Sequence, residues 1–180
     1  MLLSTLLTVA YASTSIYNGP IWGSRNPENE NAIVRDNALS CKLDQIEVCT
    51  YQDEMCFVKL QFDNCENIEE SVKRCEKSQK FEDVICNSVE LDAKITKMAG
   101  YKDSWLHTPS GFKLVTEEKD KYTLGEVQST VGLVSSGWKP VKGRIIGLGY
   151  TFDESFTSFH FRLVPEPVYM QERRKERQKR

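Results

Sequence analysis

Hydrophobic and polar residues alternate along two neighbouring stretches in the first half of the chain. In residues 56–62 (CFVKLQF) every second residue is Cys, Val, Leu or Phe, and residues 46–49 (IEVC) repeat the alternation. A period of two is typical of a β-strand with one buried face. The two runs therefore predict a hairpin that turns at Gln52-Asp53 and sets Cys49 directly opposite Cys56. A disulfide across that pair is sterically possible but is not required by the spacing.

The period changes in residues 67–80 (NIEESVKRCEKSQK). Asn67 is followed three residues later by Glu70, which is the spacing of a helix capping box. Ile68, Val72 and Cys75 would share one face of that helix. The segment therefore predicts a short helix, which Cys75 would attach to the hairpin.

Residues 101–165 have the pattern of an antiparallel sheet. Turn-forming groups (TPSG, SSGWKP, DES) separate short runs that are rich in Val, Ile, Thr and aromatic residues. The most specific expectation is a hairpin over residues 143–165 with a three-residue turn at residues 153–155, because facing phenylalanine rings can cover bare glycine backbone. Its predicted facing pairs are Phe152 with Phe156, Gly149 with Phe159, Leu148 with His160, Gly147 with Phe161, and Ile145 with Leu163.

These elements together predict an α+β protein that is mostly antiparallel β. We expect a disulfide-stapled, acidic N-terminal module with a short helix (residues 41–99), packed with a cysteine-free β-sheet (residues 100–167). Residues 1–12 are expected to be a signal peptide, residues 13–40 an irregular arm rich in Asn, Ser, Gly and Pro, and residues 168–180 a basic tail. A length of 180 residues suits one medium domain or two small units.

The cysteines point to an extracellular protein. All six fall within 46 residues, an even and regularly spaced set that is typical of a disulfide-stapled module. Zinc binding is the alternative, but no C-x-x-C or H-x₃₋₅-H pair supports it. The spacing leaves the connectivity open. The six residues are Cys41, Cys49, Cys56, Cys65, Cys75 and Cys86.

The first residues (MLLSTLLTVAYASTS) agree with export. An apolar run is followed by Ala10-Tyr11-Ala12, a small-x-small site of the kind that signal peptidase cleaves. The run is shorter than the ~20 residues of a membrane-spanning helix, and a buried N-terminal strand is the alternative. No N-x-[ST] sequon occurs, so N-linked glycans are not expected.

Charge is distributed unevenly along the chain. The net charge is −2, but residues 41–92 hold thirteen Asp/Glu against six Lys/Arg, whereas residues 171–180 hold six Lys/Arg against two Glu. An acidic module with a basic tail argues against a protein that coats nucleic acid.

Candidate catalytic residues are few. His107 and His160 are the two histidines, and neither lies in a local signature for a nucleophile–base pair. No glycine-rich segment has the context of a phosphate-binding loop. We therefore expect no enzyme activity, no metal and no cofactor. Trp22, Trp105 and Trp138 are candidates for sugar stacking or interface contacts, although core or loop packing is the expected role of a Trp.

The C-terminal segment QERRKERQKR allows three interpretations. It is a solvated end, a polyanion-binding patch for heparan sulfate or another anionic surface, or a processing site. Arg177, Lys179 and Arg180 resemble the R-x-[KR]-R site of furin-like proprotein convertases, which cleave after the last Arg. The polyanion interpretation involves Arg173, Arg174, Lys175, Arg177, Lys179 and Arg180.

The favoured functional hypothesis is a secreted, non-enzymatic protein that acts by protein–protein binding. It would be the N-terminal subunit or pro-segment of a larger secretory or viral envelope glycoprotein precursor, released by furin-like cleavage after Arg180. Its partner would be the remainder of that precursor or a cell-surface receptor, and its location extracellular or on a virion surface. One alternative is a free secreted factor tethered to heparan sulfate by its tail. The other is a small secreted hydrolase that uses His107 or His160.

Overall fold

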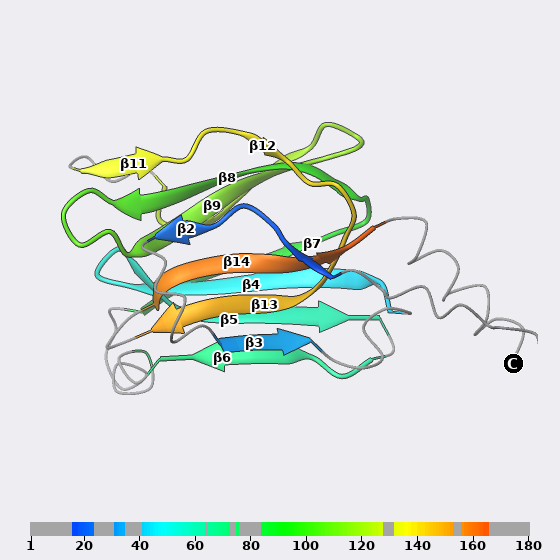
Figure 1. Ribbon diagram of the computed structural model, residues 1–180, viewed down its shortest axis with the longest axis horizontal. Coiled ribbons are helices and arrows are strands. Elements are labelled where there is room, and N and C mark those ends of the chain that lie inside the picture. Colours follow the sequence, from blue (N-terminus) through cyan, green and yellow to red (C-terminus); the bar gives the residue numbers. More distant parts are fainter. Residues whose placement is uncertain are drawn as a thin grey trace, which may run out of the picture.

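Three antiparallel sheets make up the part of the chain that the structure describes (Figure 1). The structure is a computed structural model, and it describes residues 16–23, 31–34, 41–63, 65–72, 75, 84–127, 132–152 and 156–165. Within these ranges lie fourteen strands. None of these residues belongs to a helix of the length and apolar character that a membrane crossing needs. Strands make up most of the described residues, so the fold is nearly all β and the expected α+β class is wrong.

The first sheet, sheet B, has the strand order β6-β5-β4-β7. The strands are β4 (Leu43–Tyr51), β5 (Glu54–Phe62), β6 (Ile68–Ser71) and β7 (Val84–Glu90). Strands β4 and β5 turn at Gln52-Asp53 as predicted, and both residues have positive φ (50° and 64°), as in the two-residue type I′ turn of hairpins. A bulge beside Thr50 then shifts the register, so that Cys49 faces Phe57. The predicted Cys49–Cys56 facing pair is wrong.

The helix predicted over residues 67–80 is wrong over Ile68–Ser71, whereas Cys75 is helical. Ile68–Ser71 forms β6, which pairs with β5 and sets Ile68 opposite Leu60 and Glu69 opposite Lys59. Ile68 is fully buried there, and the Lys59 Nζ lies 2.9 Å from the Glu69 Oε1. Local capping chemistry is worth about 1 kcal/mol, so sheet pairing that buries an isoleucine outweighs it. Residues 73–74 and 76–80 lie outside the described residues.

The second sheet, sheet C, has the order β10-β9-β8-β11, and β12 also pairs with β8. Its strands follow one another along the chain. The boundary expected between the N-terminal module (residues 41–99) and the β-sheet module (residues 100–167) falls inside β8. The strands are β8 (Ile95–Asp103), β9 (Pro109–Thr116), β10 (Lys121–Gly125), β11 (Leu133–Ser135) and β12 (Lys139–Pro140).

The third sheet, sheet A, joins the two ends of the described chain. It has the order β1-β14-β13-β3, and β2 also pairs with β14. Residues expected to form an irregular arm therefore supply three of its strands. The strands are β1 (Tyr17–Asn18), β2 (Trp22–Gly23), β3 (Asn31–Val34), β13 (Arg144–Phe152) and β14 (Phe156–Val164).

The β13–β14 hairpin keeps the predicted register only at its two ends. Phe152 faces Phe156 and Ile145 faces Leu163, but register shifts inside these pairs move the middle by one residue. The predicted glycine–phenylalanine and Leu148–His160 pairs are consequently wrong. The observed pairs are Gly149 with His160, Leu148 with Phe161, Gly147 with Arg162, and Tyr150 with Phe159. The turn predicted at residues 153–155 lies outside the described residues.

The core is centred on the indole of Trp22, which is 3% exposed. Its ring stacks on Phe112 of sheet C (centroids 5.5 Å apart) and on Phe159 of sheet A (5.7 Å), with Phe161 edge-on at 5.9 Å. Gly100 lies directly beneath the ring, where a Cβ would overlap the indole. The short strand β2 is thus fixed by aromatic packing more than by its two ladder residues.

Disulfides fasten sheet B and the residues beside it. The bonds join Cys41 with Cys65, Cys49 with Cys86, and Cys56 with Cys75, and no described cysteine is free. The prediction that all six cysteines form disulfides is confirmed, and Cys75 does attach its segment to the hairpin strand β5.

The disulfide pattern supplies a first test. Peptide mapping of unreduced protein is expected to recover the three pairs above with no free thiol. Their sequence separations of 24, 37 and 19 residues predict about 3–4 kcal/mol of stabilisation each in the loop-entropy description, so reduction should lower the melting temperature strongly. Different pairs, or two free thiols, would contradict the arrangement of sheet B.

Candidate functional site

The connection between β8 and β9 presents the most exposed large hydrophobic side chain in the described part of the molecule. Trp105 is 84% exposed and the next residue, Leu106, is 63% exposed. A Trp is usually among the more buried residues, and side chains of this kind at the surface of a folded protein often mark a binding surface. We call residues 104–107 the Trp105 turn.

The Trp105 turn is held rigidly by Asp103. Its Oδ1 accepts hydrogen bonds from the backbone N–H groups of Trp105 and Leu106, both at 2.7 Å. The His107 N–H donates to the Asp103 carbonyl (3.1 Å), and the Asp103 N–H donates to the Thr108 carbonyl (2.9 Å). Aspartate stabilises turns in this way. The exposed indole is therefore carried on fixed backbone, and a ligand would not have to order the turn.

Polar groups belong to the residues that flank Trp105 and Leu106 in the chain. The Lys102 Nζ donates to the His107 Nδ1 at 3.3 Å, and the Ser104 N–H donates to the Gly132 carbonyl at 2.6 Å. The second bond ties the turn to the segment that leads into β11. An apolar ring beside fixed hydrogen-bonding groups can bind a ligand that has both an apolar face and hydroxyl groups.

The turn lies at the end of the molecule where strands of two sheets finish. Figure 1 shows β8, β2 and β13 all ending on the same side, at the left of the picture. At this end Pro109 lies close to Gly23 of β2, which also lies against the Thr157 backbone of sheet A. Residues 24–30 and 153–155, which follow β2 and β13, lie outside the described residues.

The structure separates the other candidates that the sequence singled out. His160 is 1% exposed and its ring covers Gly149, whereas His107 is exposed on the Trp105 turn. The two histidines therefore do not share a site, and a substrate could not reach His160. All six cysteines are oxidised, which removes the thiolate as a nucleophile. The basic residues of the tail lie outside the described residues.

The three tryptophans differ in solvent exposure, and the sequence did not predict which of them would be exposed. Trp22 is in the core, as expected of most tryptophans, but Trp105 and Trp138 are 84% and 48% exposed. The sequence Asp103-Ser104-Trp105-Leu106 signals a turn, because aspartate accepts hydrogen bonds from the backbone N–H groups that follow it, but it does not by itself show that Trp105 is exposed.

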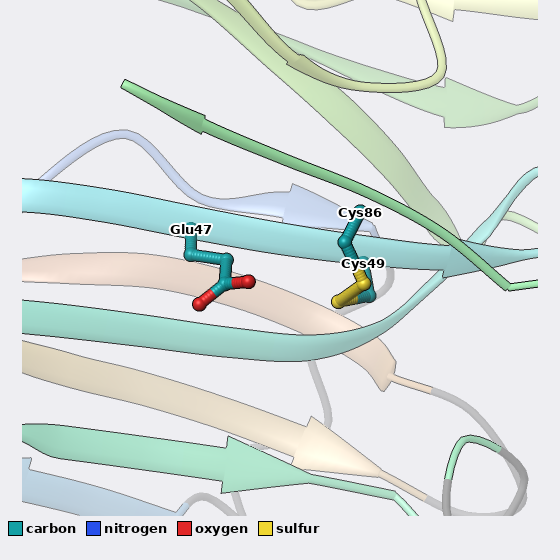
Figure 2. Close-up of side chains that lie close together, drawn as sticks. All are labelled: Glu47, Cys49 and Cys86. Atoms are coloured by element: carbon teal, nitrogen blue, oxygen red, sulfur yellow. A yellow bond between two sulfur atoms is a disulfide. The ribbon is translucent and has the colours of Figure 1, made fainter. Parts of the chain in front are cut away.

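Figure 2 shows a group of potential metal ligands on sheet B, formed by Glu47, Cys49 and Cys86. Their ligand atoms lie within 4.8 Å of one another. The two sulfurs, however, are bonded to each other across β4 and β7, where the residues face directly. A disulfide provides no thiolate, and the remaining carboxylate alone does not make a metal site.

Comparison with known proteins finds similar folds but no related sequence family. No protein-family model matches the sequence, and no curated protein matches it. Solved structures of plant lectins, in contrast, resemble it over most of its length.

Frutapin, a lectin from Artocarpus incisa, aligns with 84% of this chain and 99% of its own, at a TM-score of 0.57 and 15% identity. The mannose-binding lectin from Champedak aligns with 84% and 98% (TM-score 0.55, 14% identity). A mannose-specific jacalin-related lectin from Morus nigra, solved with mannose, aligns with 85% and 97% (TM-score 0.54, 13% identity). The chain thus resembles these β-prism lectins in fold, across nearly the full length of each.

Proposed function

We propose that the protein is a non-enzymatic carbohydrate-binding protein and that the Trp105 turn contacts the sugar. The observation that carries the proposal is an indole, 84% exposed, on a turn fixed by Asp103, in a fold that resembles those of solved lectins. The sequence alone favoured a protein as the binding partner. The proposed partner is now a glycan.

The chemistry of the turn supports a saccharide ligand. One face of a pyranose ring is lined by C–H groups and packs on an indole, while its rim of hydroxyls needs hydrogen-bond partners. Trp105 supplies the flat apolar surface. Lys102 and His107 lie on the adjoining backbone and offer N–H donors to the hydroxyls of the sugar.

The compartment remains a proposal that the disulfides support. Three disulfides are typical of secreted proteins, in which glycans of cell surfaces or of secreted glycoproteins would be the accessible ligands. Furin-like cleavage after Arg180 stays a prediction, which sequencing the C-terminus of secreted protein would test.

A glycan array tests the proposed function. We expect the purified, disulfide-bonded protein to bind a subset of the arrayed neutral glycans, including mannosides because two of the fold neighbours above bind mannose. The matching free sugar should compete, and reduced, unfolded protein should not bind. Binding to no glycan on an array that covers mammalian, plant and microbial structures would contradict the proposal.

A further inference from the structure

A groove runs between the edges of sheets A and C, where β1 lies near β12. Its volume is about 310 Å³, and we call it the lysine groove. The N-terminal segment Tyr17–Ile21 forms one wall, and Lys139, Pro140 and Lys142 form the other with Ser136. A second cavity, of about 200 Å³, adjoins it and shares Ile21 and Ser136.

The groove is positively charged. Lys139 and Lys142 are both exposed, and neither forms an ion pair within the described residues. The surrounding segment, residues 94–144, carries nine Lys/Arg against five Asp/Glu, in contrast to the acidic residues 41–92. Two unpaired ammonium groups on one wall of a concave surface favour an anionic ligand.

Two prolines make an extended peptide a poor occupant. Pro20 and Pro140 stand on opposite walls, next to the outer edges of β1 and β12. Proline has no N–H to donate, so each wall lacks one donor of the ladder that an additional strand would form. Side chains therefore contribute much of the recognition in the groove, which suits a ligand whose own polar groups are distributed around a ring.

Two residues that line the groove or the adjoining cavity have buried donors without partners. The hydroxyl of Tyr17 is buried and has no hydrogen-bond partner within the described residues, and neither has the Trp22 Nε1 in the adjoining cavity. Burial raises the pKa of the Tyr17 phenol, so this group is a neutral donor across the physiological range. Both atoms are covered by protein, so they do not contact a ligand in the groove directly and the lysines carry the recognition.

We infer that the lysine groove binds an acidic saccharide of one or two sugar units that carries sulfate or carboxylate groups. Binding pockets span about 300–1,000 Å³, so this groove, at the lower end, suits a short unit and not a long chain. Lys139 and Lys142 would contact the anionic oxygens. The Asn18 side chain, which lines the opposite wall, would contact hydroxyls. The inference is independent of the sugar site proposed at the Trp105 turn.

The experiment is calorimetric titration of the full chain with short probes at 150 mM salt. The probes are a fully sulfated heparin disaccharide, an unsulfated hyaluronan disaccharide, cellobiose and tetra-aspartate. The test variant is Lys139→Gln with Lys142→Gln. The control is Lys119→Gln with Lys121→Gln, which removes the same charge from sheet C away from the groove. Every variant retains the basic tail, so the tail cannot account for a difference between them.

We expect one or both acidic disaccharides to bind, and their dissociation constants to rise at least about tenfold in the test variant and less than about twofold in the control. Lys139→Arg with Lys142→Arg should retain binding, which separates lost charge from misfolding. Sulfate is the recognised group if only the heparin disaccharide binds, and carboxylate suffices if both bind. Equal weakening in test and control variants, or tetra-aspartate binding as tightly as the disaccharides, would overturn the inference. Neutral-glycan binding should be unchanged in the test variant, so the two proposed sites can fail separately.

Discussion

Replacing Trp22 with alanine is expected to lower the free energy of unfolding by about 3–5 kcal/mol. The indole is 3% exposed and joins sheet A to sheet C through Phe112 and Phe159. Its loss would leave a cavity where the two sheets meet, and would release a strand that has only two ladder residues. Urea denaturation followed by circular dichroism measures the change without relying on tryptophan fluorescence.

A double-mutant cycle with Gly100 serves as the control. Gly100→Ala alone should destabilise the protein by about 1–3 kcal/mol, because its Cβ would overlap the Trp22 indole. In the Trp22→Ala background the same change should have little effect, because the new methyl group occupies vacated space. Additive losses would show that Trp22 does not pack on Gly100, and would contradict the core described above.

Trp105→Ala is expected to weaken glycan binding by at least about 30-fold. Loss of an aromatic contact at the centre of a binding site costs about 2 kcal/mol, which corresponds to that change in the dissociation constant. The free energy of unfolding should change by less than about 0.5 kcal/mol, because an indole that is 84% exposed has few packing contacts to lose. Titration of wild type and variant with the best glycan of the array measures both constants.

Trp138→Ala is the matched control for Trp105→Ala. Trp138 is also solvent-exposed, at 48%, but lies outside the Trp105 turn, next to β12. Its replacement should leave neutral-glycan binding unchanged. If Trp138→Ala abolished that binding while Trp105→Ala did not, the sugar site would lie away from the Trp105 turn.

Features set by neighbouring residues could be predicted from the sequence. The alternation in residues 46–49 and 56–62 located β4 and β5 with their turn at Gln52-Asp53, because strand period and turn chemistry are local properties. The clustering of the cysteines likewise predicted that all six are oxidised. The turn at Gln52-Asp53 shows the limit of this kind of reasoning. A bulge beside it moved Cys49 opposite Phe57, and nothing in the local pattern marks a bulge.

Features set by distant residues could not be predicted in the same way. Tyr17 pairs with Leu163, so the arm became a strand only through a partner near the other end of the chain. Ile68–Ser71 carries a helix signal but lies in a sheet edge, because β5 offers burial that an isolated helix lacks. Trp105 was one of three tryptophan candidates in the sequence, and its exposure could not be predicted for a related reason. Composition favours burial of tryptophan, and only the hydrogen bonds of Asp103 reveal that this one is held outward.

The most direct test of the proposed sugar site follows the tryptophan indole N–H signals by NMR during a glycan titration. The chain has three tryptophans, and each gives one signal. Trp105 should shift progressively and saturate at the affinity that calorimetry gives, whereas the buried Trp22 should stay unchanged as an internal reference. Saturable glycan binding that leaves the Trp105 signal in place would contradict the assignment of the sugar site to this turn.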